Sequence, residues 1–224
     1  MTPSQTYSAV RTRLLDLAST LDGSAQSTAV PALPGWSVRD AYAHLTGICT
    51  DVLTKRLTTL ASPEWTAGQV ADRAKLPFAD VCAEWAKAGP SMDAFLASPG
   101  ADRSLLLVQD AWQHEQDVHG ALGLPADRDV ETCTWMAAFT LRYLTHKWPE
   151  DMPAVRVVAG PIDHMLGKGE VAATLRTDPY ELARLTLGRR SREQILALDW
   201  EGDPSAMLGS LHTFTMPGEP VMEG

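Results

Sequence analysis

The sequence has few of the residues on which several common classes of protein depend. Three of its 224 residues are cysteines, Cys49, Cys82 and Cys133, and no pair of them has the C-x-x-C spacing. A disulfide framework or a zinc knuckle built from thiolates is therefore not indicated. Basic residues are also scarce, with 19 Lys and Arg against 28 Asp and Glu, for a formal net charge of -9. This balance argues against nucleic acid or an anionic membrane as the main partner and favours a small ligand.

Long hydrophobic runs and several well-known catalytic signatures are missing too. No stretch approaches the roughly 18 apolar residues of a membrane span. The N-terminal segment lacks the uninterrupted apolar core of a signal peptide, so we expect a cytoplasmic protein. The sequence contains no G-x-G-x-x-G after a strand, no phosphate loop and no G-x-S-x-G elbow. A nucleotide-binding fold or a serine hydrolase of these types is thus not indicated.

Hydrophobic periodicity predicts helices in the N-terminal part of the chain. Apolar residues recur at helical spacing near residues 7–21, 37–52, 78–96, 108–122 and 131–147. Ser37 followed by Asp40 predicts a capping box at the start of the second of these helices. Gly89-Pro90 predicts a kink or a break within the third. We therefore expect a helical domain over residues 1–148.

After Pro153 the pattern changes to short runs of β-type residues and short helices. Strands are predicted near 154–158 and 171–175. Asp178 and Asp203, each followed by proline, predict the starts of two helices. Residues 149–224 should therefore form a small mixed α/β domain. The fold class predicted for the whole chain is α+β, mainly α.

The helix containing DAWQHEQDVHGALG carries the most informative pattern in the chain. One face of it, on a 3.6-residue period, has Val108, Ala111, Trp112, Glu115, Val118, His119 and Leu122. A carboxylate in an apolar stripe is costly to bury unless it is neutralised, paired or bound to a cation. Glu115 and His119 lie one turn apart, so both can point at a single metal ion. The pair therefore predicts part of a metal site.

His44 is the best candidate for a third ligand, because a catalytic zinc site usually has three protein ligands. It flanks the apolar stripe of the second predicted helix. Gly47, one turn further on, indicates a close approach or a space kept open there. The spacing alone leaves open that His44 is a hydrogen-bonded core residue without a metal.

His114 and Asp110 lie on the same predicted helix as Glu115 and His119. His114 and Glu115 do not begin a zinc-protease helix, because the second histidine of that motif would fall at Val118. We expect His114 to lie behind the ligands or at the surface, with Asp110, one turn back, able to orient it.

The C-terminal part of the chain contains a cluster of three arginines, Arg189, Arg190 and Arg192. Its guanidinium groups can bind a carboxylate, the alternative being a solvated surface run.

Two segments, LPGWSVRDAYAHLTG and TDPYELARLTLGRRSREQILALDWEGDP, together with the E-x-x-x-H helix between them, resemble the mycothiol-dependent maleylpyruvate isomerase family. The resemblance implies a DinB-like four-helix bundle in the N-terminal half. It also implies a divalent metal, usually zinc, held by His44, Glu115 and His119, with mycothiol or a related thiol as cosubstrate at the fourth position. There the metal would create a thiolate nucleophile.

The family resemblance predicts a mycothiol-dependent S-transferase or cis-trans isomerase acting on an electrophilic small molecule. In the isomerase, a thiolate adds to a cis double bond, rotation follows, and elimination gives the trans isomer. The arginine cluster would supply contacts to the substrate carboxylate. Two alternatives stay open: a hydrolase that uses metal-bound water, and a non-catalytic metal-binding or thiol-binding stress protein.

Overall fold

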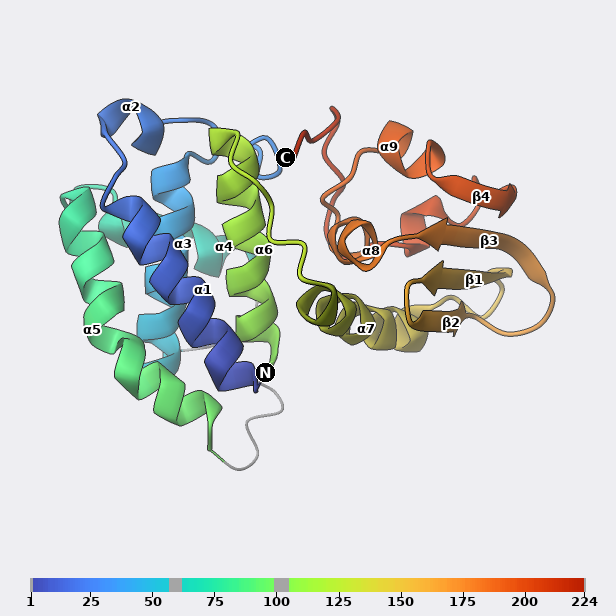
Figure 1. Ribbon diagram of the computed structural model, residues 1–224, viewed down its shortest axis with the longest axis horizontal. Coiled ribbons are helices and arrows are strands. Elements are labelled where there is room, and N and C mark those ends of the chain that lie inside the picture. The colour runs from blue at the N-terminus through green and yellow to red at the C-terminus, as the bar shows by residue number, and fades with distance from the viewer. Residues whose placement is uncertain (1, 57–61, 99–104, 224) are drawn as a thin grey trace. The chain divides into compact units, whose positions relative to one another are not determined.

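A computed structural model describes residues 2–56, 62–98 and 105–223 of the chain. The chain forms two compact units, residues 1–125 with 223–224 and residues 126–222 (Figure 1). The first unit is helical and the second contains a four-stranded mixed sheet. The structure is therefore α+β and mainly α, which confirms the fold class predicted from the sequence.

The first unit is built from helices only. They are α1 (Pro3–Ala18), α2 (Gly23–Gln26), α3 (Val38–Leu53), α4 (Pro63–Arg73), α5 (Phe78–Leu96) and α6 (Leu105–Leu122). Helices α1, α3, α5 and α6 form a four-helix bundle in which α1 and α3 each pack against both α5 and α6 (Figure 1). Helix α4 packs on the outside of α3. This arrangement places residues from α3, α4 and α6 close together.

Local sequence signals set the starts of the long helices. The side-chain oxygen of Ser37 accepts a hydrogen bond from the backbone N–H of Asp40, and the Asp40 carboxylate accepts one from the N–H of Ser37. This is the predicted capping box, and it fixes where α3 begins. Thr2 and Gln5 make the same reciprocal pair at the start of α1.

Helix α5 runs through Pro90, so of the two outcomes predicted at Gly89-Pro90, a kink or a break, the break does not occur. Packing against α1 holds the helix together at this point. Arg11 of α1 makes two hydrogen bonds of 2.8 Å to the carboxylate of Asp93 and a longer one to the carbonyl of Gly89. Tertiary contacts therefore outweigh the missing N–H of the proline.

The core of the bundle is aromatic as well as aliphatic. Trp85 is fully buried and donates its indole N–H to the hydroxyl of Tyr7 at 3.0 Å. The hydroxyl of Tyr42 donates to the backbone carbonyl of Leu14 at 2.7 Å. Since a buried polar atom without a partner costs about 1–3 kcal/mol, these bonds allow the large rings to be buried cheaply.

The second unit combines a sheet with helices. Its elements are α7 (Val130–Lys147), β1 (Ala154–Ala159), β2 (Ile162–Leu166), β3 (Val171–Thr177), α8 (Pro179–Thr186), α9 (Arg192–Leu196), β4 (Asp199–Gly202) and a short 3-10 helix, Leu208–Ser210. The strand order is β2-β1-β3-β4, with β1 and β3 parallel and both outer pairs antiparallel. Helix α7 packs on α8 and β2.

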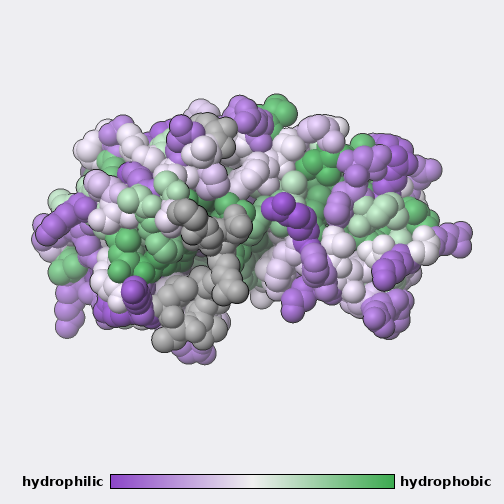
Figure 2. All heavy atoms as spheres, turned by 90° about the horizontal axis from the view of Figure 1, so that it is seen from below, coloured by the Kyte–Doolittle hydropathy of each residue, from purple (hydrophilic) through white to green (hydrophobic). Residues whose placement is uncertain are grey.

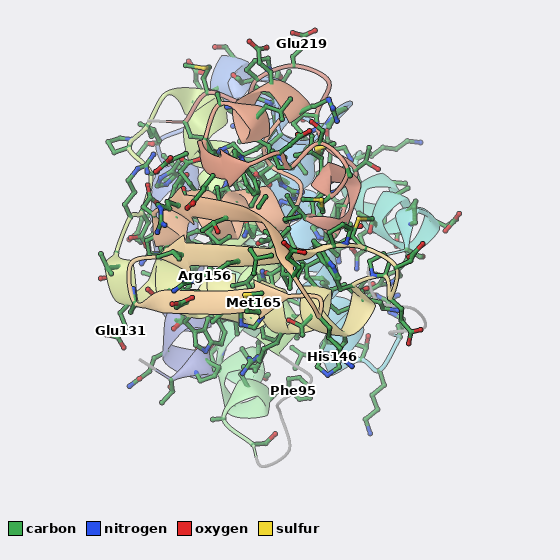
Figure 3. All side chains as sticks on the ribbon, turned by 90° about the vertical axis from the view of Figure 1, so that its right-hand side faces the viewer. Phe95, Glu131, His146, Arg156, Met165 and Glu219 are labelled. Carbon is green, nitrogen blue, oxygen red and sulfur yellow. The ribbon has the colours of Figure 1, made fainter. Side chains whose placement is uncertain are left out.

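The two faces of the sheet differ in polarity. Val155 and Val157 of β1 are fully buried, whereas Arg156 between them is exposed and pairs with Asp163 of β2. The strand register sets Arg156 opposite Met165, and both are labelled on neighbouring strands in Figure 3. This alternation is typical of a sheet with one packed face and one solvated face.

Several sequence predictions for this part of the chain need correction. The predicted strands correspond to β1 and β3, and the helix starting after Asp178 is α8, but β2 and β4 lie at the sheet edges and were not predicted. No long helix follows Asp203, whose carboxylate instead accepts from the N–H of Ser205 in a turn. The predicted boundary at 148/149 also differs from the structure, because α7 belongs to the unit that contains the sheet.

Exposed hydrophobic residues do not gather into one large area on the face drawn in Figure 2, where green regions are interrupted by hydrophilic side chains. None of the helices in the described ranges is both long enough and apolar enough to cross a membrane.

Candidate metal centre

Three side chains of the first unit bring potential ligand atoms together. His44 lies on α3, whereas Asp110 and His114 lie one turn apart on α6, and their ligand atoms are all within 4.8 Å of one another. The Nε2 atom of His44 is 3.3 Å from Oδ2 of Asp110, and Nε2 of His114 is 3.4 Å from Oδ1. The two imidazoles are 5–6% exposed, whereas the Asp110 side chain is 28% exposed. The cluster is therefore buried on its histidine side and open at the carboxylate.

The orientation of the His44 ring is fixed by α4. Its Nδ1 atom lies 2.7 Å from Oε1 of Gln69, and the amide nitrogen of Gln69 donates to Asp51 at 2.9 Å. Because a carboxylate only accepts, the Gln69 amide must turn its nitrogen to Asp51 and its oxygen to His44. In the neutral ring, Nδ1 of His44 therefore carries the hydrogen, and Nε2 faces the cluster with its lone pair.

The ring of His114 is held in the same way by a carboxylate. Its Nδ1 atom is 3.0 Å from Oδ2 of Asp117, whose side chain is fully buried. Nδ1 therefore donates to Asp117, and Nε2 is turned toward Asp110. A histidine that gives its second ring N–H to a carboxylate is typical of metal ligands in proteins.

The electrostatics of the cluster favour a positive charge between the three residues. Burial by itself lowers the pKa of His114, but the charges of Asp110 and Asp117 and the hydrogen bonds to both raise it to about 9. Burial likewise raises the pKa of Asp110, but the charges of His44 and His114 outweigh it and hold that pKa well below its usual range. Without a metal, protons supply the positive charge that this site requires.

The geometry of the cluster fits a divalent metal. Oδ2 of Asp110 is buried and has no hydrogen-bond partner among the described residues. Such an atom is costly in a folded protein unless a cation or water satisfies it. In a tetrahedral zinc site with ligand bonds of about 2.1 Å, neighbouring ligand atoms lie about 3.4 Å apart. The separations between Asp110 and the two imidazoles, 3.3 Å from Oδ2 to Nε2 of His44 and 3.4 Å from Oδ1 to Nε2 of His114, are close to that spacing, with a different carboxylate oxygen nearest to each ring.

Trp36 forms a wall of the cluster. Its ring centroid is 5.3 Å from that of His44 and 6.0 Å from that of His114, with the latter pair stacked at 20°. Trp36 directly precedes Ser37, the residue that caps α3, so the helix start sets its position. No role was predicted for Trp36 from the sequence. The sequence signal for such a role was the position of Trp36 directly before the cap of the helix that carries His44.

The structure does not bring Glu115 and His119 to His44, so the metal set predicted from the sequence is corrected. Glu115 is fully buried, as the stripe predicted, but both of its oxygens accept hydrogen bonds of 2.7 Å from Arg13 of α1. His119 lies near the end of α6, with Nδ1 2.7 Å from the carbonyl oxygen of Pro125. Arg13 therefore supplies the positive charge and the hydrogen bonds that the buried Glu115 carboxylate needs, in place of the metal that the sequence predicted.

The apolar stripe of α6 was a misleading guide, because this helix is buried on nearly every side. From residue 107 to 118 every side chain except Asp110 is buried, polar ones included. An apolar stripe cannot identify the functional face of such a helix. Asp110 and His114 have the same one-turn spacing as Glu115 and His119, so D-x-x-x-H was the signal in the sequence. His114 was predicted to lie behind the ligands or at the surface, with Asp110 orienting it, whereas both residues themselves face His44.

The three arginines of the C-terminal part lie in the second unit. Arg190 makes two hydrogen bonds, of 2.7 and 2.9 Å, to the carboxylate of Glu181. Arg189 is buried and donates to the carbonyl of Leu187, and Arg192 is exposed at the start of α9. Their binding of a substrate carboxylate stays a prediction.

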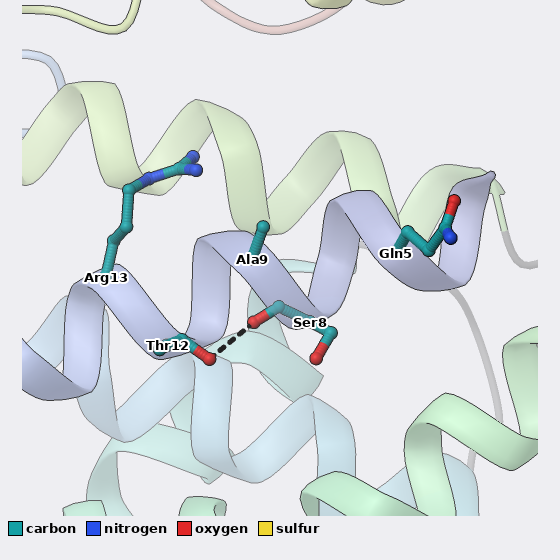
Figure 4. A pocket seen from close by; sticks show the side chains of 5 residues that line it. All are labelled: Gln5, Ser8, Ala9, Thr12 and Arg13. Atoms are coloured by element: carbon teal, nitrogen blue, oxygen red, sulfur yellow. Dashed lines mark hydrogen bonds between the residues drawn. The ribbon is translucent and has the colours of Figure 1, made fainter. Parts of the chain in front are cut away.

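A shallow hollow of about 480 Å³ lies along α1, lined by Gln5, Ser8, Ala9, Thr12 and Arg13 (Figure 4). Its polar side chains have partners of their own: Thr12 donates to the carbonyl of Ser8, and Arg13 binds Glu115. The hollow contains none of the three clustered residues. It therefore offers no alternative to the cluster as a reactive site.

Comparison with known proteins gives one family and one fold. The model of the mycothiol maleylpyruvate isomerase N-terminal domain matches residues 7–132. A crystal structure of the mycothiol-dependent maleylpyruvate isomerase is similar, with 13% identity and a TM-score of 0.53, and a histidine-to-alanine mutant of it gives 15% and 0.59. Each match covers 84% of this chain and 88% of the other. No curated protein matches the sequence. At such identity the structural likeness concerns the fold alone.

Proposed function

Because the chain belongs to the mycothiol maleylpyruvate isomerase N-terminal domain family, we propose that it is a metal-dependent enzyme using mycothiol or a related small thiol as nucleophile. It would act as an S-transferase or as a cis-trans isomerase of the maleylpyruvate type. The observation that carries the proposal is the cluster of His44, Asp110 and His114, in which both imidazoles turn Nε2 toward one carboxylate.

These three residues would hold the metal. Two imidazoles and one carboxylate are the ligand set of several catalytic zinc sites, so zinc is the metal we propose. When bound, a metal with three protein ligands keeps a further position for a thiol and holds it as a thiolate at neutral pH, where a free thiol of pKa about 8.5 is only slightly ionised.

The surrounding residues support binding from one side. The buried histidine rings and the indole of Trp36 shield the cluster, whereas Asp110 keeps part of its side chain exposed. A small molecule would therefore approach at the Asp110 edge. Shielding the other side strengthens electrostatic interactions within the site, because water there is excluded.

The chain's own thiols are poor nucleophiles, which supports an external thiol. Burial raises the pKa of Cys49 and Cys82 to about 11 and that of Cys133 to about 12. All three are therefore uncharged at neutral pH, and only a thiolate is strongly nucleophilic.

The two proposed reactions differ in the fate of that thiol. In the isomerase, sulfur bonds to one carbon of the cis double bond, the resulting single bond rotates, and loss of the thiol restores the double bond as trans. The thiol is regenerated. In the transferase, the carbon–sulfur bond persists and one thiol is consumed for each product.

Metal analysis of the purified protein tests the proposal first. The parent should hold one divalent ion per chain, and Asp110→Ala and His114→Ala should each hold little. His119→Ala is the matched control on the same helix and should bind metal as the parent does. Equal metal content in the parent and both cluster variants, or a parent that binds no metal, would contradict the proposed centre.

Turnover assays then separate the chemistry. Maleylpyruvate or a general electrophile should react only when metal and mycothiol are both supplied. A hydrolysis product formed without thiol would indicate a hydrolase, and thiol binding in a calorimeter without any turnover would indicate a non-catalytic protein. Either result would overturn the proposed activity while leaving the metal centre intact.

A further inference from the structure

Behind His44, on the side away from Asp110, lies a short chain of polar contacts between α3 and α4. Gln69 of α4 is 3% exposed and contacts both His44 and Asp51. The helices approach closely at this point, since a Cβ atom added to Gly47 would lie only 2.6 Å from Cβ of Gln69. Glycine at position 47 therefore permits the contact that reaches His44.

Asp51 is the anchor of this chain of contacts. Its Oδ2 atom accepts hydrogen bonds of 2.9 Å from the indole of Trp65 and from the amide of Gln69, and Oδ1 is 3.0 Å from the guanidinium of Arg56. All three of these contacts come from donor groups, and a carboxylate only accepts. A carboxylate at this place therefore permits only one orientation of the Gln69 amide.

We infer that Asp51 and Gln69 are positioning residues that fix the tautomer of His44 and so present its Nε2 lone pair to the metal position. The inference rests on the proposed metal centre and adds residues that do not touch it. Which nitrogen of a histidine carries the hydrogen is set by the hydrogen bond that the other one makes. Asp51 thus acts on His44 through the amide of Gln69.

Reversal of the amide would have the opposite effect. With its nitrogen turned toward His44, Gln69 would donate to Nδ1, and the hydrogen of the neutral ring would move to Nε2. A ring with a hydrogen on Nε2 has no lone pair there to bind a metal. His114 is not exposed to this risk, because Asp117 contacts its Nδ1 directly and can only accept.

Asp51→Asn is the sharpest variant, because it keeps the shape of the side chain and adds a donor. The new side-chain amide would be able to donate to the Gln69 oxygen, which permits the reversed orientation of Gln69. Zinc affinity, measured by competition with a chromophoric chelator, should fall 10–100-fold, the usual effect of changing a residue behind a metal-bound histidine. Gln69→Met, which removes both contacts, should give a similar loss.

Arg56→Ala is the matched control. It removes another contact of Asp51 but leaves the bond between Asp51 and Gln69 in place, so zinc affinity should change less than threefold. Circular dichroism and thermal melting of all variants would show that each remains folded under the conditions of the affinity measurement.

A spectroscopic signature separates positioning from a general structural role. In histidine-labelled, metal-free protein, at a pH where both rings are neutral, long-range ¹H–¹⁵N correlation spectra should show the hydrogen of His44 on Nδ1. In Asp51→Asn it should move toward Nε2, while the His114 ring keeps its hydrogen on Nδ1.

An unchanged His44 spectrum in Asp51→Asn, or zinc affinity equal to that of the parent, would overturn the inference. A parent that binds no zinc would overturn the proposed function instead. The tautomer measurement distinguishes the two failures, because it needs no metal.

Discussion

The two faces of α6 bury carboxylates in different ways. Toward α1, Glu115 is matched by Arg13 with two short hydrogen bonds, so both of its oxygens are satisfied. Toward α3, Asp110 meets two histidine nitrogens, and its Oδ2 atom has no hydrogen-bond partner among the described residues. The Glu115 carboxylate has its charge and hydrogen bonds balanced by Arg13 in the folded protein. The Asp110 carboxylate is balanced only when the histidines bind protons or the cluster binds a metal.

This difference shows why burial of an acid is a weak indicator of function. Glu115 is the more deeply buried of the two acids, at 0% side-chain exposure against 28% for Asp110. A guanidinium neutralises a carboxylate and donates to both of its oxygens, so a buried carboxylate paired in this way does not need a metal. The carboxylate of the candidate metal centre is instead the one whose neighbours are titratable imidazoles.

Removing the ion pair between Arg13 and Glu115 should have the largest effect on stability. Arg13→Met leaves a buried carboxylate without its cation, and we expect the free energy of unfolding to fall by about 3 kcal/mol. This value is near the lower end of the losses seen when a buried ion pair is broken, because the Arg13 side chain is 44% exposed. Urea unfolding measures this loss. Zinc binding by the folded protein should be unchanged; a matching loss of zinc affinity would show that the two faces are not independent.

Adding a side chain between α3 and α4, next to the contact of Gln69 with His44, should have a smaller effect on stability and should also weaken metal binding. In Gly47→Ala the added Cβ would clash with Gln69 at 2.6 Å, so α4 must shift. We expect a net loss of about 1–2 kcal/mol, since overpacking outweighs the gain in helix propensity, together with weaker zinc binding.

Gly68→Ala provides the control for this prediction. It lies in the same helix as Gln69, and a Cβ there meets nothing within 4 Å. It should preserve zinc binding and raise stability slightly. Equal behaviour of the two glycine variants would remove the steric explanation.

The smallest expected effect is a pH dependence of the metal-free protein. The pKa of His114 is raised to about 9, above the value of about 6.5 for an unfolded histidine. The stabilising proton is therefore fully bound below pH 6.5 and is lost as the pH rises through about 9. Between pH 7 and 8 the free energy of unfolding should fall by at most about 1.4 kcal/mol.

The zinc-loaded protein provides the comparison for this pH dependence. His114 should carry no proton on Nε2 when it holds zinc, so its share of the pH dependence should disappear over the same range. Thermal melting at matched ionic strength measures both forms. A metal-free protein that gains stability from pH 7 to 8 would contradict the assignment of charge to this cluster.

Much of the helical architecture was predictable because its signals are local. Apolar spacing gave the long helices, and the pair Ser37 and Asp40 gave the start of α3. The edge strands β2 and β4 were not predictable, because short edge strands depend on their neighbours in the sheet for their hydrogen bonds. The continuity of α5 through Pro90 could not be decided from the sequence for a similar reason: contacts from Arg11 hold the helix together across this residue.

By itself, the sequence determined the mainly helical class, the family resemblance, the place of His44 on α3 and the burial of Glu115. Only the tertiary structure decided which acid meets His44. Glu115 and Arg13 are 102 positions apart in the chain, and their pairing depends on the packing of α1 against α6. Because α6 is buried on nearly every side, its periodicity shows that it is central but not which helix each face meets. That choice turned Asp110 and His114, and not Glu115 and His119, toward the candidate metal centre.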